Sequence, residues 1–316
     1  MTWPTAADFV AAMLSWKATF VYGYLAWALF VHFRGRERHK FHRQLTDHST
    51  VIAPYNAIMY AFSAVPNRPY IEVDQFPELK PLRDNWQLIR EEALKLFDEG
   101  HIRAASTFND LGFNSFFRRG WKRFYLKWYD APLASARALC PRTVAMVESI
   151  PTINGAMFAM LPAGGDLGRH RDPFAGSLRY HLGLITPNDE RCRIFVDGQP
   201  YHWRDGEAVM FDETYIHWAE NHTDTDRLIL FCDVERPLTN RVVARLNHWI
   251  KGTLVRASQT ENEAGDKVGF LNRMFGWAYY FRYPGKALKR YNKYVYYAAK
   301  WLILLGIIYA VFFWRP

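Results

Sequence analysis

The stretch from Gly155 to Val234 constrains the fold most, because short apolar segments alternate there with turn signals. Asp197-Gly198 and Asp205-Gly206 are dipeptides typical of the tight turns that join antiparallel strands. Several short strands at such close spacing indicate a sandwich or a barrel, and a double-sheet jelly roll is one architecture that protects its edges. The expected strands are AMFAML, LRYHLGLI, RIFV, YHW, AVMF and RLILFCDV.

A candidate metal-binding triplet, His170-Arg171-Asp172, lies between two of these segments. A His and an Asp separated by one residue supply two members of the 2-His-1-carboxylate triad of non-haem Fe(II) oxygenases. His217, which follows a later strand and turn, is the candidate third ligand. Two His and one carboxylate also suit Zn or Mn. In the alternative without a metal, His217 is a packed histidine and Asp172 a turn residue.

An arginine follows the second His, and a binding site for a keto-diacid would need such a cation there. Arg227 lies ten residues after His217 and opens the apolar segment LILFCDV. A five-carbon keto-diacid chelates iron through its oxo group and C1 carboxylate, so its far carboxylate requires a cation some distance from the metal. The planar guanidinium of Arg can bind that carboxylate with two hydrogen bonds. Together with an open coordination position, Arg227 favours iron over other metals.

Longer motifs stand in the segment from Leu161 to Leu238, namely HRDP, SLRYHLGL, WRDGE, FDETYIHWAEN and the Arg that begins the last strand. With them the segment resembles the aspartyl/asparaginyl β-hydroxylase domain, and within that family it most closely resembles the bacterial lipid A 2-hydroxylases. NWQLIREE at 85–92 and GWKRFYLKWY at 120–129 fit the same family, as do apolar segments at both termini. The resemblance therefore covers most of the chain.

This resemblance implies hydroxylation that depends on Fe(II), with 2-oxoglutarate and O2 as cosubstrates. Carried over by position, the iron ligands would be His170, Asp172 and His217. The residues that would bind 2-oxoglutarate are Arg227, at its distal carboxylate, and His181, Arg179 and Trp121. The animal protein hydroxylases of the family have Gly at the position of Asp172, so the triad is more complete in this chain.

Long apolar runs stand at both ends of the chain. Residues 9–33 contain one charged residue, Lys17, and residues 294–314 also contain one, Lys300. Each run reaches the roughly 20 residues that a bilayer-spanning helix needs, and each carries the Trp and Tyr that favour a membrane interface. We therefore expect a membrane helix at each terminus. The second run has only 14 strictly apolar residues after Lys300, so an interfacial helix is the alternative there.

Charges beside these runs indicate their orientation. RGRERHKFHR at 34–43 follows the first run and RYPGKALKRYNKY at 282–294 precedes the second, whereas the outer ends carry almost no charge. By the positive-inside rule we expect the residues between the runs in the cytoplasm, at the inner membrane of a bacterium. The three cysteines form no C-x-x-C pair, which agrees with a reducing compartment.

Helical patterns flank the β region. Residues 84–99 place apolar side chains on one face after an Asp-Asn start, which predicts an amphipathic helix. Residues 116–129 predict a strand that enters the core, whereas the proline-containing stretch 44–80 indicates a loop. The expected fold is mainly β, a double-stranded β-helix (jelly-roll or cupin-like) core with flanking helices and a membrane helix at each end. The expected parts are a membrane helix at 1–33, a basic juxtamembrane linker at 34–80, the dioxygenase domain at 81–240, a helical basic-aromatic membrane-proximal segment at 241–293 and a membrane helix at 294–316.

The charge balance bears on the substrate. Lys and Arg number 40 against 31 Asp and Glu, a formal net charge of +9, which favours an anionic partner. Because the basic residues cluster beside the apolar runs and not on one recognition element, nucleic acid is not the expected partner. Together with the resemblance, these features favour a lipid A-type phosphoglycolipid, hydroxylated at the 2-position of an acyl chain at the cytoplasmic face of the membrane.

Two alternatives stay open. The substrate of the family's animal members is an Asp or Asn side chain of a protein, although a soluble substrate would not require an anchor at each end. The other alternative is a cupin-like binding module that holds a structural metal without turnover, and Arg227 with an open coordination position argues against it. The sequence indicates neither which acyl chain is attacked nor an oligomeric state.

Overall fold

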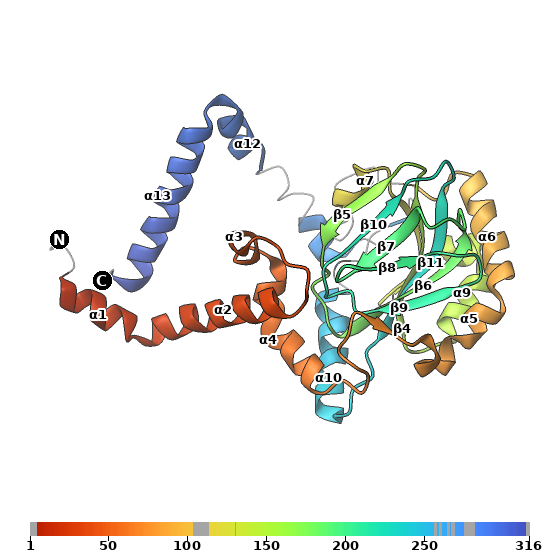
Figure 1. Cartoon of the computed structure of the whole chain (residues 1–316), viewed down its shortest axis with the longest axis horizontal. Helices are drawn as coiled ribbons and strands as arrows, with labels where there is room; N and C mark the ends of the chain where they lie inside the picture. Colours follow the sequence, from red (N-terminus) through yellow and green to blue (C-terminus); the bar gives the residue numbers. More distant parts are fainter. Residues whose placement is uncertain are drawn as a thin grey trace.

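A computed structural model describes residues 5–103, 114–129, 131–255 and 282–313, with short stretches between 256 and 281. Its centre is a pair of β-sheets, which stand between two groups of helices (Figure 1). The strands are β1 (Tyr70–Ile71), β2 (Lys122–Trp128), β3 (Ala131–Pro132), β4 (Ile153–Leu161), β5 (Asp166–His170), β6 (Ser177–Ile185), β7 (Cys192–Val196), β8 (Gln199–His202), β9 (Ala208–Phe211), β10 (His217–Asn221) and β11 (Arg227–Glu235).

The helices fall on both sides of the sheets. On one side lie α5, α6 and α9, and on the other lie α2, α4 and α10 (Figure 1). The α-helices are α1 (Ala6–Met13), α2 (Trp16–Phe33), α3 (Phe41–Gln44), α4 (His48–Ala61), α5 (Lys80–Asp84), α6 (Trp86–Asp98), α7 (Asn114–Phe117), α8 (Ala134–Leu139), α9 (Pro141–Glu148), α10 (Arg241–Ile250), α12 (Arg282–Tyr291) and α13 (Lys293–Phe312).

The two sheets form a double-stranded β-helix. The larger has the strand order β1-β9-β6-β11-β4-β2-β3, and the smaller has the order β5-β10-β7-β8. From β4 to β11 the chain passes back and forth between the sheets, with the β7–β8 hairpin as one step of the smaller sheet. This is the jelly-roll core that the turn signals predicted.

The central strands of the larger sheet are buried along almost their whole length. Every residue of β4 is buried, and β6 and β11 are buried except at their last residue. Continuous apolar strands of this kind require cover on both faces of the sheet. One face meets the smaller sheet, and helix α6 packs on the other through Ile89, Ala93 and Leu96, which its helical spacing places on one side.

A two-residue turn fixes the β7–β8 hairpin. Val196 pairs with Gln199, so Asp197 and Gly198 alone form the loop, and both have positive φ, at 52° and 80°. Such a turn matches the right-handed twist of the flanking strands. The expected turn at Asp197-Gly198 is thus confirmed.

Several helical expectations need correction. The described residues contain more helix than strand, so a mainly β chain is wrong, although the core is β. The stretch 44–80 is not a loop throughout, because α4 occupies 48–61 with Pro54 inside it. Its start is stabilised by the Asp47 side chain, which accepts hydrogen bonds from the backbone N–H and hydroxyl of Ser49. The predicted helix at 84–99 is confirmed as α6. The strand predicted at 116–129 is confirmed only from Lys122 on, as β2, because α7 occupies the first residues of that range.

The N-terminal apolar run is not one continuous helix. It breaks between α1 and α2 at Leu14 and Ser15, where the Ser15 hydroxyl donates to Ala12 O at 2.6 Å and accepts from Ala18 N at 3.3 Å. Among the described residues, α13 alone is long and apolar enough to cross a membrane. The expectation of a spanning helix at both termini is therefore wrong for the first run, which forms two helices, neither of them both long and apolar enough among the described residues. Part of the expected segment 241–293 lies outside the described residues.

The close approach of backbone at Gly183 gives a test of the core. A Cβ at this position would lie 2.1 Å from the carbonyl oxygen of Arg204, which cannot retreat because Gly183 exchanges backbone hydrogen bonds with Gly206 and Glu207. We predict that Gly183→Ala lowers the free energy of unfolding by about 2 to 3 kcal/mol, the usual cost of overpacking. Urea unfolding in detergent micelles measures it. Gly252→Ala, which meets open space, is the control, and equal stability of the two variants would contradict the prediction.

Candidate metal centre

Strand pairing brings the two predicted histidine ligands together. His170 ends β5, His217 begins β10, and the two residues lie directly opposite each other in this antiparallel pair. Side chains in opposite positions share one face of a sheet, and the two ring centroids are 4.2 Å apart. Asp172 follows in the next loop, where its backbone N–H donates to Glu213 O at 2.9 Å. Ligand atoms of all three residues lie within 4.8 Å of one another.

Hydrogen bonds select the tautomer that a metal needs. Nδ1 of His170 lies 2.7 Å from Gly168 O, and Nδ1 of His217 lies 3.0 Å from Tyr215 O. A carbonyl oxygen only accepts, so each Nδ1 carries the proton and each Nε2 presents its lone pair. Nε2 of His170 is 3.9 Å from Oδ1 of Asp172, which leaves room for an ion between them. This donor set fits a divalent metal of the iron type.

The charges of the three ligands also suit a metal. Burial lowers the pKa of His170, and it lowers that of His217 to about 3, so both rings are neutral near pH 7. Burial alone would raise the pKa of Asp172, but the guanidinium of Arg179 beside it holds that pKa below its ordinary value. The site therefore offers two neutral nitrogens and one carboxylate anion.

Arg179 positions this carboxylate. One of its terminal nitrogens donates to Oδ2 of Asp172 at 2.8 Å, and its Nε donates to Asp233 at 2.9 Å. The same guanidinium forms an ion pair with Glu213, whose other oxygen accepts from Ser177 Oγ at 2.9 Å. Asp172 is thus left with Oδ1 for a metal. These contacts make Arg179 a positioning residue, and its part in binding 2-oxoglutarate stays a prediction.

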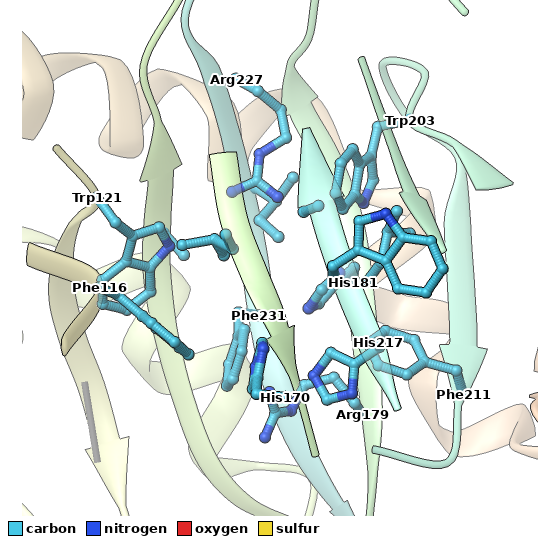
Figure 2. A pocket seen from close by; sticks show the side chains of 16 residues that line it. Phe116, Trp121, His170, Arg179, His181, Trp203, Phe211, His217, Arg227 and Phe231 are labelled. Atoms are coloured by element: carbon cyan, nitrogen blue, oxygen red, sulfur yellow. The ribbon is translucent and has the colours of Figure 1, made fainter. Parts of the chain in front are cut away.

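The triad forms one end of a pocket, and Arg227 lies at the opposite end. Figure 2 shows His170, His217 and Arg179 together, with His181 between them and Arg227. The pocket opens to solvent. It contains all the predicted site residues except Asp172, whose loop lies beside the pocket. Its lining consists of Phe116, Trp121, Ala159, Leu167, His170, Arg179, His181, Ile194, Trp203, Phe211, His217, Trp218, Ala219, Arg227, Ile229 and Phe231.

Arg227 is a buried cation without a counter-ion in the part of the chain that the structure describes. Its guanidinium lies 4.3 Å from the ring of Trp203, its Nε has no hydrogen-bond partner, and no described carboxylate pairs with it. Burial lowers its pKa to about 10, so it is still protonated near pH 7. An unpaired buried charge is costly. An anionic group in the pocket would remove that cost, as the distal carboxylate of 2-oxoglutarate would.

His181 and Trp121 complete the predicted set. Both ring nitrogens of His181 are buried and have no hydrogen-bond partner among the described residues, and burial, with Arg227 nearby, lowers its pKa well below the usual value. A neutral imidazole with two unused nitrogens can donate one hydrogen bond to an oxygen in the pocket. Trp121 lines the pocket from the other side and packs edge-on against Phe116.

Three site residues were missed by sequence reasoning. Asp233 holds Arg179, Trp203 stacks on Arg227, and the ring of Phe231 lies 3.8 Å from the Arg179 guanidinium. A signal for Asp233 existed, since an acid inside the apolar run LILFCDV must find a partner when the strand is buried. Trp203 opens the motif WRDGE, which indicated the family but not a contact with Arg227, and nothing in the sequence around Phe231 distinguishes it from core aromatic residues.

Helices α4 and α10 hold the loop that follows His170 and contains Asp172. Asn56 of α4 donates to Pro173 O at 2.8 Å and accepts from Ala175 N at 3.0 Å. Asn247 of α10 donates to Gly176 O at 3.1 Å. This loop begins at Asp172, so both helices determine where the ligand carboxylate lies.

The end of α2 contacts the same region. Arg171, between the two ligands of the triplet, donates to Val31 O at 3.1 Å. Arg34 lies between the rings of Tyr60 and Tyr215 and donates to Asp212 at 2.8 Å. Asp212 is fully buried and also accepts from Arg236 at 2.8 Å. The N-terminal segment is therefore part of the structure that supports the site.

Loss of either histidine should remove the metal site. We predict that His170→Ala and His217→Ala each weaken the binding of Mn(II), a stand-in for Fe(II), by at least about 100-fold. Loss of a residue that only hydrogen-bonds to a metal ligand already lowers metal affinity about 10- to 100-fold, and loss of the ligand itself should cost more. Titration followed by electron paramagnetic resonance measures the affinity. His202→Ala is the matched control, since that ring bonds Glu190 O outside the pocket. Unchanged affinity in either ligand variant would remove that residue from the site.

Comparisons with known proteins agree with this geometry. The family model described as Aspartyl/Asparaginyl beta-hydroxylase matches residues 83–237. The chain is 33% identical over 207 residues to the Ornithine lipid ester-linked acyl 2-hydroxylase of Rhizobium tropici, which is 63% of this chain and 71% of that protein. It is 28% identical over 164 residues to the human Aspartyl/asparaginyl beta-hydroxylase, which is 50% of this chain and 21% of the human protein.

Among solved structures, the chain is similar to a Pseudomonas putida prolyl-4-hydroxylase, with a TM-score of 0.32 and 18% identity, over 59% of this chain and 99% of that one. The relationship to the Rhizobium tropici protein, over most of both chains, establishes the family that the motifs resembled. The chain belongs to the aspartyl/asparaginyl β-hydroxylase family of Fe(II)- and 2-oxoglutarate-dependent hydroxylases, and it carries a His-Asp-His metal site.

Proposed function

We propose that this hydroxylase adds a hydroxyl group to C2 of an acyl chain in a membrane lipid. The observation that carries the proposal is the similarity to the Rhizobium tropici protein, whose name describes 2-hydroxylation of an ester-linked acyl chain, over 71% of that protein's length. Helix α13 also supports it, because an apolar helix of 20 residues would keep the enzyme beside such a substrate.

The pocket lining fits an apolar substrate. Leu167, Ile194 and Trp218 line it, and its two cationic side chains among the described residues are Arg179 and Arg227. Arg179 is already engaged by three carboxylates, and we assign Arg227 to the distal carboxylate of 2-oxoglutarate. No cation of the lining is then left for the carboxylate of an aspartyl substrate. An acyl chain requires none.

The residues of the pocket have separate tasks in this reaction. When bound, iron and 2-oxoglutarate supply the oxidation that converts C–H to C–OH, with O2 as the oxygen source and succinate and CO2 as by-products. His170, Asp172 and His217 hold the metal, and Arg227 with His181 orients the cosubstrate. The aromatic lining excludes water from the reacting carbon.

The head group that we propose is that of lipid A, a phosphorylated glycolipid. The net charge of +9 favours an anionic head group over the ornithine head group of the relative's substrate. We also propose that the catalytic domain faces the cytoplasm at the inner membrane of a bacterium, because the basic residues flank the apolar segments on the side of that domain.

A second candidate is hydroxylation of an Asp or Asn side chain in a protein. The similarity to the human Aspartyl/asparaginyl beta-hydroxylase, 28% over 164 residues, favours it. The matched segment is 21% of that protein.

Mass spectrometry of lipids tests the proposal. In cells that express the protein with iron and oxygen available, we expect lipid A to gain one oxygen atom on an acyl chain. The gain should vanish in His170→Ala and persist in His202→Ala. The same gain on ornithine lipid alone would contradict the proposed head group and favour that of ornithine lipid. No gain on any lipid would shift the assignment to protein substrates.

Arg227 provides a test of cosubstrate binding. We predict that Arg227→Ala raises the 2-oxoglutarate concentration for half-maximal turnover about 100-fold, because losing one partner of a buried charge pair costs about 3 kcal/mol. Mn(II) affinity should stay unchanged, which separates this effect from loss of the metal. Arg193→Ala, which removes a half-exposed arginine paired with Glu220, is the control. An unchanged requirement in Arg227→Ala would refute the assignment.

A further inference from the structure

Helix α10 exposes an apolar stripe. Val242, Leu246 and Trp249 follow helical spacing along one face and are 70%, 36% and 63% exposed. Val243 and Asn247, on a different face, are buried against the rest of the protein. The helix therefore has an inner face that packs against the protein and, separate from it, an outer apolar stripe that no described residue covers. Such a stripe ordinarily marks an interaction surface.

Two cations accompany the stripe. Arg241 and Arg245 are exposed, lie one turn apart, and have neither an ion pair nor a hydrogen-bonded side chain in the part of the chain that the structure describes. Arginine stems can lie along an apolar surface while the guanidinium reaches polar surroundings. Trp and Leu on one face with Arg beside them are typical of helices that lie in the interface of an anionic bilayer.

Helix α4, the neighbour of α10, carries a second stripe. Val51, Ile58 and Phe62 share one of its faces by helical spacing, and all three are exposed. The two helices pack against each other through the Tyr55 hydroxyl, which donates to Asn247 at 2.7 Å. Figure 1 shows them side by side next to the β core. The α4–α10 surface consists of the exposed residues Val51, Ile58, Phe62, Val242, Leu246 and Trp249.

This surface lies close to the metal centre. The inner faces of the same helices hold the loop that begins at Asp172, through Asn56 and Asn247. A helix is about 10 Å across with its side chains. A ligand of the outer stripes would therefore lie roughly one helix diameter from the loop that carries a metal ligand.

We propose that the α4–α10 surface rests in the head-group region of an anionic lipid bilayer and seats the catalytic domain on the membrane. The unpaired Arg241 and Arg245 match anionic head groups, and the apolar stripes reach the acyl boundary. Helix α13 of the same chain is exposed along its apolar length, which also suits contact with lipid. The inference rests on the proposed lipid substrate and deepens it, since a domain seated on the bilayer lies beside acyl chains, but its test does not depend on turnover.

A second copy of the chain fits this surface less well. Six side chains on two helices supply little of the roughly 800 Å² per partner that stable protein interfaces bury. In a twofold dimer built on this face, the arginines beside the stripe would also approach their own copies, and like charges that meet are costly.

Fluorescence quenching by brominated lipids tests the proposal in the full chain. Leu246→Cys and Leu94→Cys each carry a bimane label, since the native cysteines are buried, and the protein is reconstituted in vesicles of phosphatidylglycerol and phosphatidylcholine with brominated acyl chains. Leu94 is the matched control, because it is similarly exposed but lies on α6, across the β core from α10. We expect loss of fluorescence at 246 and none at 94. Leu302→Cys on α13 reports that the chain is inserted.

Removing the charges tests the anionic partner. The double variant Arg241→Gln with Arg245→Gln should lose most of the quenching at 246. The protein with both arginines intact should lose it as well when the vesicles contain phosphatidylcholine alone. Quenching at 302 without quenching at 246 would overturn the proposal. If, in addition, a label at 246 self-quenched as the protein density in the vesicles rose, the surface would belong to a second copy. Hydroxylation of a protein substrate with quenching intact would overturn the proposed function and leave this inference standing.

Discussion

The metal centre depends on one buried guanidinium. Arg179 on β6 attracts carboxylates from three parts of the chain: Asp172 in its loop, Glu213 in the turn before β10 and Asp233 on β11. A charge buried without partners would cost several kcal/mol, so these segments are stable only where they meet. Burial raises the pKa of Glu213 and Asp233, whereas Arg179 keeps that of Asp172 low. Asp172 is therefore the member of this cluster that ionises most readily.

The second buried arginine of the pocket has the opposite character. Arg227 contacts the ring of Trp203 and meets no carboxylate among the described residues. One end of the pocket is thus anionic and suited to a metal, and the other is cationic and suited to a carboxylate. A dicarboxylate with a chelating end can enter in one direction only. The remaining lining can be apolar, since the metal site and Arg227 between them face both ends of such a cosubstrate.

The sequence allowed the ligands and the core to be predicted because their signals are local. His170, Asp172 and His217 stand beside short strands in the order typical of a 2-His-1-carboxylate triad, and paired Asp-Gly turns indicate antiparallel strands. The partner of Asp233 could not be predicted, because it depends on the register in which Asp233 pairs with Arg179 across β11 and β6. Helix α4 was not predicted, because Pro54 suggested a break and Asp47 was not recognised as the residue that caps the start of a helix. A similar capping residue, Ser15, divides a run that composition alone treats as continuous.

The contacts of the N-terminal segment have a consequence for how this enzyme can be divided. The family model spans residues 83–237, and every proposed ligand lies within those bounds. A fragment cut there would lack Arg34, which neutralises Asp212, and both helices that hold the loop after Asp172. It would keep the complete set of ligand atoms but leave Asp172 on an unsupported loop, near a buried carboxylate, Asp212, with only one of its two arginines. The unit that binds the metal is therefore smaller than the unit that must fold.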